Sequence, residues 1–264
     1  MALALAARST AWAAAFSVSP LPMTLSPSQM SDLLKVTNDG DSEASFQIRT
    51  FAWSQTPDGT IDLKPSSEIV AFPEIFTIGP SETRPIRIGV LRPPGTTEKT
   101  YRVLVQELPP PHLPGRTIQL LPQLDMPVYV TPPTAEGVPE IAMPAVAGGM
   151  LLFAVADTGT AHIKITRLSI TGHGDGQTIF TVSSAPTYVL AGGRRDYAVQ
   201  IGASDCAKTR TISIAATLSD PDRTVTQEVM IPPDGCSGQA GLTGFELDTR
   251  QKVTIVTETA RSSQ

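Results

Sequence analysis

The sequence has no excess of basic residues: 20 lysines and arginines stand against 25 aspartates and glutamates, for a net charge of -5. Binding to a nucleic-acid backbone needs a positive surface, so this balance argues against nucleic acid as a partner. No stretch after the N-terminus approaches the run of about 18–20 apolar residues that a membrane span needs, so the mature protein is predicted to be soluble. The apolar fraction of 41% and the charged fraction of 17% indicate a globular chain.

Signals for catalysis or metal binding are also scarce. The chain has three histidines, and none stands at metal-ligand spacing from another histidine, a cysteine or a carboxylate cluster. His162 falls in a strand pattern and is predicted to be structural. The glycine-rich segment at residues 172–176 lacks the lysine and the helix of a phosphate-binding loop and is typical of a hairpin turn. We therefore predict a protein that is not an enzyme and uses no cofactor, metal or small-molecule substrate.

The N-terminus has the features of an export signal. Residues 2–7 are nearly all apolar, and the alanines at 11, 13 and 15 provide small-x-small cleavage sites. This pattern predicts a cleaved secretion signal at residues 1–15. No basic residue precedes the apolar run, and Arg8 interrupts it, so a frayed N-terminus is the alternative.

Cysteine is nearly absent, with only Cys206 and Cys236. An even pair in an exported chain predicts one disulfide, whereas two free thiols would be the alternative. A loop of about 30 residues corresponds to a stabilisation of roughly 3–4 kcal/mol, confined to the C-terminal half.

Short alternating segments separated by turn residues fill most of the chain, with a turn every eight to twelve residues. Phe46 and Ile48 alternate out of phase with Phe51 and Trp53, which predicts a β-bulge between the two pairs. No long apolar pattern of helical period is present. The predicted strands lie at residues 16–25, 32–37, 45–53, 69–72, 75–78, 84–91, 101–108, 117–130, 150–156, 162–170, 178–182, 187–190, 197–201, 209–218 and 225–231.

This rhythm predicts an all-β chain of two immunoglobulin-like β-sandwich domains in tandem. The N-terminal domain is placed at residues 16–131 and the C-terminal domain at 140–236. The proline-rich segment 132–139 is predicted to be the linker between them. Residues 237–264 are polar, show no packed pattern and are predicted to form a mobile tail.

Several segments of the first half resemble, in order, the PapD-like periplasmic pilus chaperones, and more closely their non-classical (archaic) branch. The resemblance spans roughly residues 16–132 and is weak beyond them. It implies two sandwiches in an L-shaped arrangement, a periplasmic location, pilin-like subunits as partners and an outer-membrane usher as a further one. The segments that carry it are Phe16-Ser-Val-Ser-Pro20, Leu33-Leu-Lys-Val-Thr-Asn38, Phe51-Ala-Trp53, Pro73-Glu-Ile-Phe76-Thr-Ile78-Gly-Pro80, Ile86-Arg87-Ile88, Tyr101-Arg-Val-Leu-Val-Gln-Glu107-Leu-Pro-Pro110 and Pro127-Val-Tyr-Val-Thr-Pro132.

The resemblance also implies a mechanism, in which the last strand of the first domain completes the fold of a subunit that lacks a strand. Backbone hydrogen bonds give such β-augmentation its affinity, and alternate side chains fill pockets in the partner. In the predicted strand 117–130, the apolar side chains at period two are Ile118, Leu120, Leu124 and Met126. Each would contribute roughly 1.5–3 kcal/mol when buried in a partner. The alternative is that this face packs the core of the first domain itself.

The charged anchors of the best-known branch are not matched. That branch binds the carboxylate of the subunit through an arginine in the first strand and a lysine late in the donor strand, and these positions align with Pro22 and Pro127. Pro122 also removes one backbone donor from the strand. Arg87 is the first candidate for a replacement anchor, because its guanidinium points away from Ile86 and Ile88. An internal salt bridge is the alternative role for Arg87, and Arg84, Arg102 and Arg116 are alternative anchors.

The sequence therefore predicts a chaperone that assembles pilus subunits. An exported adhesin or structural module of the same fold is the alternative from another class. A chaperone needs an accessible strand edge at residues 117–130, whereas a structural module would cover or charge that edge. A hydrolase on a sandwich scaffold is a third reading, which a pocket with a perturbed histidine or carboxylate would favour.

Overall fold

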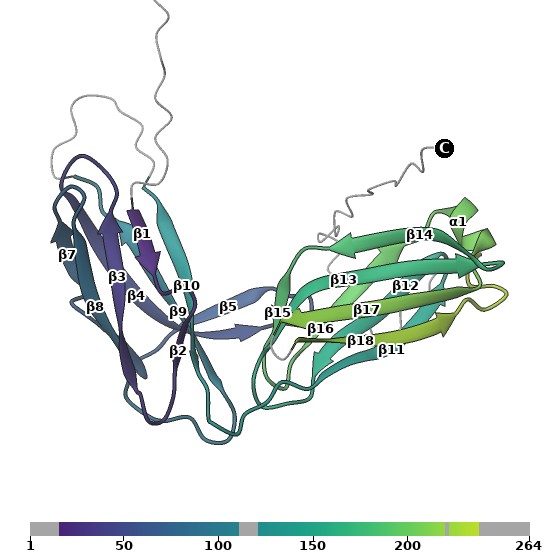
Figure 1. Cartoon of the computed structure of the whole chain (residues 1–264), viewed down its shortest axis with the longest axis horizontal. Helices are drawn as coiled ribbons and strands as arrows, with labels where there is room; N and C mark the ends of the chain where they lie inside the picture. The colour runs from purple at the N-terminus through teal and green to yellow at the C-terminus, as the bar shows by residue number, and fades with distance from the viewer. Residues whose placement is uncertain (1–15, 111–120, 220–221, 238–264) are drawn as a thin grey trace, which may run out of the picture. The chain divides into compact units, whose positions relative to one another are not determined.

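The computed structural model describes residues 16–110, 121–219 and 222–237. Within these ranges the chain forms eighteen strands and one short helix, so the predicted all-β fold of two β-sandwiches is confirmed (Figure 1). Two compact units are distinguished. The first comprises Met1–Ala52, Leu63–Pro93 and Lys99–Val130, and the second comprises Trp53–Asp62, Pro94–Glu98 and Thr131–Gln264. The predicted secretion signal and nearly all of the predicted tail lie outside the described residues.

The strands before residue 131 form two facing sheets. The four-stranded sheet has the order β1-β3-β8-β6. The second sheet has the order β2-β10-β9-β4-β5, and β7 also pairs with β4. The strands are β1 (Phe16–Ser19), β2 (Met23–Leu25), β3 (Ser31–Asn38), β4 (Ala44–Gln55), β5 (Ile61–Pro65), β6 (Ile69–Phe72), β7 (Ile75–Ile78), β8 (Thr83–Val90), β9 (Lys99–Glu107) and β10 (Gln123–Val130).

Alternating side chains build the core between these sheets. Leu34 on β3, Ile86 and Ile88 on β8, and Val103 and Val105 on β9 are fully buried, as their period of two predicts. Each strand therefore turns one face inward and leaves the other face free for contacts outside the core.

The first predicted strand, residues 16–25, is in fact two strands in different sheets. β1 pairs with β3 in one sheet, and β2 pairs with β10 in the other. Pro20 and Pro22 lie between them, and a proline has no N–H for a ladder hydrogen bond. The prolines therefore end the first pairing, and the chain crosses to the second sheet.

The β-bulge predicted between Ile48 and Phe51 is wrong. β4 pairs with β9 in one unbroken register from Phe46 opposite Glu107 to Ala52 opposite Tyr101. Phe51 and Trp53 therefore lie on the outer face of the sheet. Apolar residues occupy both faces of this strand. The change of phase between the two apolar pairs is therefore a change of face, and not a break in the register.

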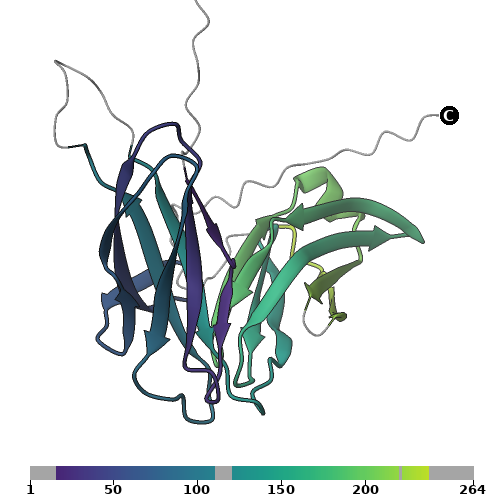
Figure 2. The same ribbon diagram turned by 60° about the vertical axis from the view of Figure 1, so that its left-hand side comes forward.

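The second unit is a sandwich of a three-stranded sheet, β11-β12-β16, and a larger sheet, β14-β13-β17-β18, in which β15 also pairs with β13 (Figure 2). The predicted disulfide is present and joins Cys206 on the helix to Cys236 after the last strand. The elements are β11 (Pro139–Ala147), β12 (Met150–Asp157), β13 (Ile163–Gly174), β14 (Gln177–Ser184), β15 (Thr187–Val189), β16 (Arg194–Gln200), α1 (Ala203–Lys208), β17 (Thr211–Ser219) and β18 (Asp222–Met230).

Sequence reasoning missed three elements: β5, β11 and α1. In β11 the register shifts between Ala142 and Ala145, Met143 has a positive φ of 52°, and Pro144 follows it. This irregularity hides the alternation of a strand. The helix has six residues, which is less than two turns and too short to show a helical period.

Candidate functional site

The candidate site is the edge of β10, the last strand of the first sandwich. On one side β10 pairs with β9 along its whole length, from Gln123 to Val130. On the other side it pairs with β2 over Val128–Val130 only. Among the described residues, the segment from Gln123 to Pro127 therefore has no strand on its second side. The strand was predicted to begin at residue 117; Ile118 and Leu120 lie outside the described residues.

The two faces of β10 have different surroundings. Met126, Val128 and Val130 are fully buried in the core of the first sandwich, and Leu124 is half-buried against that core. The ladder with β9 places Met126 opposite Val103, and both side chains point inward. Met126 is thus committed to the chain's own core, which corrects its assignment as a side chain offered to a partner.

Polar contacts hold the outer face of β10 to its neighbours. Arg102 on β9 forms an ion pair with Asp125, with 3.3 Å between Nη1 and Oδ1. Nη2 of Arg49 on β4 donates hydrogen bonds to the side-chain oxygens of Gln106 and Gln123, each at 3.4 Å. These contacts connect three adjacent strands, so β10 is fixed to the sheet at the residues where its second edge is open.

The two prolines at the anchor positions of the best-known branch occupy neighbouring places in this sheet. Pro22 directly precedes Met23, which pairs in register with Val128, the residue after Pro127. Neither proline carries an N–H or a charge. Where the pairing of β2 with β10 ends, this chain thus has two residues that cannot donate a backbone hydrogen bond and cannot bind a carboxylate.

Arg87 lies on a different sheet from β10. It is an exposed residue of β8, in the middle of the four-stranded sheet, and Nη1 donates a 3.0 Å hydrogen bond to Oγ of Ser31. Its neighbours Ile86 and Ile88 are fully buried, so the guanidinium projects from the outer face of that sheet. The structure therefore does not bring Arg87 to the donor strand, because the core separates the two outer faces.

Arg87 lies instead within a group of exposed apolar side chains. In the ladder of the four-stranded sheet it stands between Leu33 on β3 and Phe72 on β6, which are 41% and 78% exposed. Val70, two residues before Phe72 on the same face, is 40% exposed. We call Leu33, Val70, Phe72 and Arg87 the outer-sheet patch. Sequence reasoning missed it, although the Leu33-Leu34 doublet signals apolar residues on both faces of β3.

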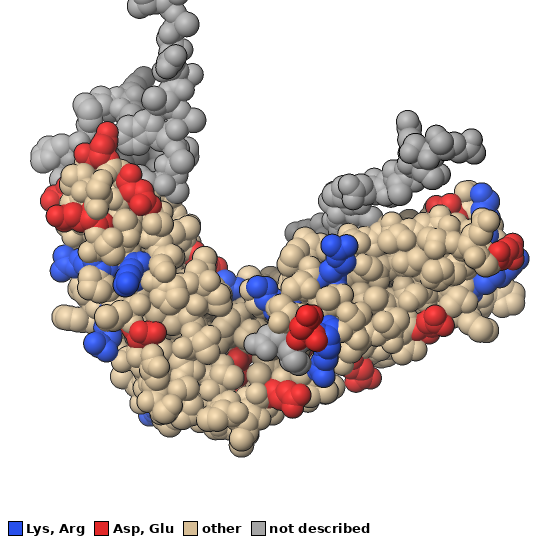
Figure 3. All heavy atoms as spheres, in the orientation of Figure 1, with Lys and Arg blue, Asp and Glu red and all other residues tan. Residues whose placement is uncertain are grey.

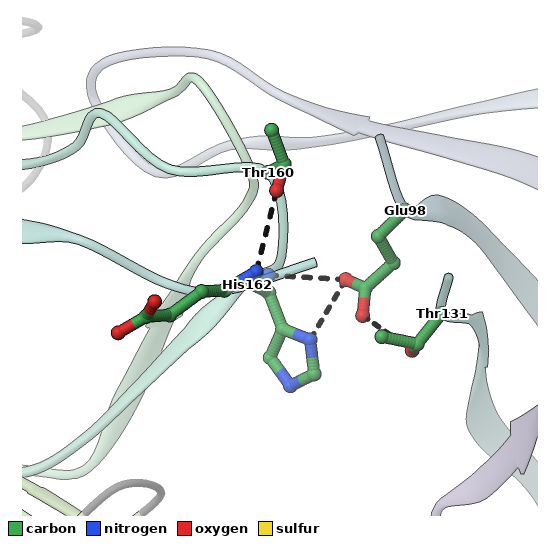
Figure 4. A network of polar contacts seen from close by, with 5 residues as sticks. Glu98, Thr131, Thr160 and His162 are labelled. Carbon is green, nitrogen blue, oxygen red and sulfur yellow. Dashed lines mark hydrogen bonds and ion pairs between the residues drawn. The ribbon is translucent and has the colours of Figure 1, made fainter. Parts of the chain in front are cut away.

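A buried carboxylate in the second unit was also missed. Oε1 of Glu98 accepts hydrogen bonds from the backbone N–H of His162 at 3.1 Å and contacts Nδ1 of that residue at 2.8 Å. Oε2 accepts from the Thr131 hydroxyl at 2.7 Å (Figure 4). The Glu98 N–H donates to the carbonyl of Thr160. Both carboxylate oxygens are occupied by structural partners, so the network ties chain segments together, in keeping with a structural His162.

Other titratable groups also have structural partners. Burial raises the pKa of Asp157, whose Oδ1 accepts hydrogen bonds from the backbone N–H groups of Val138 and Gly159. Within the described ranges no group of three histidine, cysteine or carboxylate side chains could hold a metal ion. In the same part of the chain, no helix has the length and apolar character to span a membrane.

Comparison with known proteins identifies the first half of the chain. The PapD N-terminal domain family of pili and flagellar-assembly chaperones matches residues 15–136. No curated protein matches the sequence. The solved structures it resembles include the CsuC–CsuE chaperone–tip adhesion subunit complex of archaic Csu pili of Acinetobacter baumannii. The TM-score is 0.58 at 19% identity, over 81% of this chain and 97% of that one.

Two further structures extend the comparison. The class 5 fimbriae chaperone CfaA has a TM-score of 0.57 at 13% identity, over 82% of this chain and 99% of its own. The Salmonella enterica SafB chaperone with its SafA pilin has a TM-score of 0.54 at 13% identity, over 84% and 98%. Over 81–84% of its length the chain thus has the two-domain fold of these structures, and residues 15–136 match the model of the PapD N-terminal domain family. The match to this family model agrees with the resemblance seen in the sequence.

Proposed function

We propose that this protein is a periplasmic chaperone that binds a pilus subunit by lending it a β-strand. The observation that carries the proposal is the open edge of β10, the last strand of a PapD-type domain. This edge runs from Gln123 to Pro127, and the apolar alternation at Ile118 and Leu120 precedes it in the sequence. An unpaired strand edge provides backbone donors and acceptors for an incoming strand, which is the requirement for β-augmentation.

The proposal gives the apolar side chains between residues 118 and 126 two different roles. Met126 is fully buried in the core of the first sandwich and holds β10 there. In this proposal Ile118 and Leu120, together with the half-buried Leu124, supply the side chains for pockets of the subunit. At roughly 1.5–3 kcal/mol for each buried side chain, the two upstream residues account for a binding contribution of several kcal/mol before ordering costs.

A carboxylate anchor at the two proline positions is excluded by their chemistry. Of the arginines considered from the sequence that the structure describes, Arg102 lies nearest to β10, because it stands opposite Pro127 in the ladder and is ion-paired with Asp125. We therefore place Arg102 before Arg87 as the candidate anchor. Backbone pairing and apolar side chains carry most of the affinity in this proposal.

The outer-sheet patch is the proposed contact for the second predicted partner, the outer-membrane usher. Exposed apolar side chains in a contiguous group mark protein interaction sites. Because this patch lies on the opposite sheet from β10, the usher can bind while the donor strand holds a subunit. Phe72→Ala should weaken usher binding and leave subunit capture unchanged. Met230→Ala, which removes an apolar side chain 76% exposed on the second unit, is the control.

The test is co-expression with the pilin-like proteins encoded next to this chain, followed by co-purification. A stable one-to-one complex is expected, and Ile118→Glu should abolish it. Gln119→Glu is the matched control, because it adds the same charge one residue along, on the opposite face of a strand. If none of these subunits forms a complex with the protein, the chaperone proposal is refuted and the exported structural module is favoured. Equal loss in both variants would show that charge, and not the apolar face, determines binding.

A further inference from the structure

Glu107 is a carboxylate on the face of β9 that points into the first sandwich. Tyr101, Val103 and Val105 precede it on this face at a period of two, and all three are buried in the core. In the ladder with β4, Glu107 stands opposite Phe46, whose side chain is fully buried as well. Residues opposite each other on adjacent strands share a face. The side chain of Glu107 therefore points inward, at the end of an apolar row.

The neighbours of this carboxylate are apolar. On the β4 side, the ring of Phe46 contacts those of Phe16 and Phe76, with 5.0 and 5.7 Å between ring centroids. On the β10 side, the backbone N–H of Glu107 donates a 3.2 Å hydrogen bond to the carbonyl of Pro122. Among the described residues, the carboxylate itself has no hydrogen-bond donor and no cation beside it. Burial raises the pKa of Glu107, because the charged form loses water and gains no partner.

Other carboxylates at this end of the first sandwich face water. Figure 3 shows acidic side chains gathered at one end of the first unit. Asp39, Asp41 and Glu43 lie in the loop before β4, Glu82 lies directly before β8, and all four are exposed. These loop carboxylates keep their hydration, so they need no partner. Glu107 is half-buried within a strand and differs from them in this respect.

Glu107 also lies beside the inward face of β10, where that face emerges from the core. Met126, opposite Val103, is fully buried, and Leu124, one row further along, is half-buried against the core. The next row consists of Pro122 and Glu107. Successive rows on one face of a sheet are about 7 Å apart. A subunit that pairs with the open edge of β10 and covers Leu124 therefore also reaches the carboxylate of Glu107.

We infer that Glu107 is a specificity-determining residue, whose carboxylate forms an ion pair with a lysine or arginine of the captured subunit. The inference rests on the chaperone function proposed above. Covering an ionised carboxylate is strongly unfavourable unless a cation or several hydrogen-bond donors replace its water. A subunit with a basic side chain at this position meets that requirement. A subunit with an apolar or acidic side chain there leaves a buried, unpaired charge and is rejected.

The test is a binding titration of the parent protein and its variants with the pilin-like subunit that co-purifies with it. Glu107→Gln should weaken binding at neutral pH at least about tenfold, because it removes a charge-assisted contact. Its melting temperature without the subunit should be equal to or above that of the parent, since the unpaired charge is gone. Acidification should weaken binding less in Glu107→Gln than in the parent. Glu43→Gln removes an exposed charge at the same end and should bind as the parent does.

Charge reversal identifies the partner side chain. Glu107→Lys should abolish capture, and changing one lysine or arginine of the subunit to glutamate should restore it. If the parent captures the subunit and Glu107→Gln binds equally well, the inference is overturned while the chaperone function stands. A lower melting temperature of Glu107→Gln, or no subunit variant that restores capture by Glu107→Lys, would also overturn it. If the parent captures no subunit, the chaperone function itself fails, and the inference fails with it.

Discussion

Met126 and Ile118 share one apolar alternation in the sequence, but the proposed function gives them opposite roles that single substitutions can separate. Met126 is fully buried in the core of the first sandwich, opposite Val103. Truncating a buried methionine to alanine costs about 2–5 kcal/mol, through lost transfer free energy and the remaining cavity. Met126→Ala should therefore lower the free energy of unfolding of the first sandwich by that amount. For a unit of this size the melting temperature should fall by roughly 10 °C or more.

The Ile118→Ala variant should show the converse behaviour. If Ile118 fills a pocket in the subunit, its truncation should leave the melting temperature of the free chaperone unchanged. The loss of roughly 1.5–3 kcal/mol of burial in the complex corresponds to about a 10- to 150-fold weaker affinity for the subunit.

The assays are differential scanning calorimetry of the free protein and a binding titration with a purified subunit. Glu228→Ala is the control for both, because this exposed residue of β18 lies outside the first sandwich and should change stability by less than about 0.5 kcal/mol. The reasoning is refuted if Met126→Ala melts at the same temperature as the parent protein but fails to bind the subunit. That result would mean that Met126 leaves the core and enters the partner.

Three further predictions concern stability. Reducing the Cys206–Cys236 disulfide, whose partners are 30 residues apart, should destabilise the second unit by about 3–4 kcal/mol, measured by urea unfolding with and without reductant. A hydrogen bond from Lys99, supported by one from a tyrosine hydroxyl, lowers the pKa of Glu68. The hydrogen-bonded carboxylate stabilises the fold above the usual pKa near 4.5, and this stabilisation is lost as the pH falls through the lower folded-state pKa. Glu68→Gln should therefore flatten the dependence of the melting temperature on pH in this range. Glu98→Ala should cost at least about 2 kcal/mol in calorimetry by leaving buried donors unpaired, whereas Glu98→Gln should retain most of the stability.

The fold was predictable from the sequence because strand alternation and turn residues are local signals. The boundaries of β6 and β7 were predicted to the residue, and most strands to within a few residues. The errors occur where the alternation of apolar and polar residues does not match which side chains are buried. In β4 the outer residue Trp53 is buried as well as the inner Phe46, so a regular strand looked like a bulged one.

The site was less predictable, because sequence alone cannot decide which partner an apolar face contacts. The alternation through Leu124 and Met126 was the same whether those residues faced a subunit or the chain's own core. Only the register of β10 against β9 decides this. Similarly, the isoleucines around Arg87 showed that its side chain points outward, but the strand order was needed to place it on the sheet that lacks β10.

The prolines of the donor strand limit what its described part can contribute. Successive N–H groups of a strand point to opposite sides. Between Gln123 and Pro127, the residues whose backbone faces the open edge are therefore either Leu124 and Met126 or Gln123, Asp125 and Pro127. In the second case Pro127 removes one donor. Either way two N–H groups are available as donors, beside the carbonyl acceptors of the same edge, and each hydrogen bond contributes roughly 0.5–1.5 kcal/mol. The same scarcity hinders pairing between two copies of the chaperone. We therefore expect the apolar residues upstream of Pro122 to add to the affinity that backbone pairing along β10 provides.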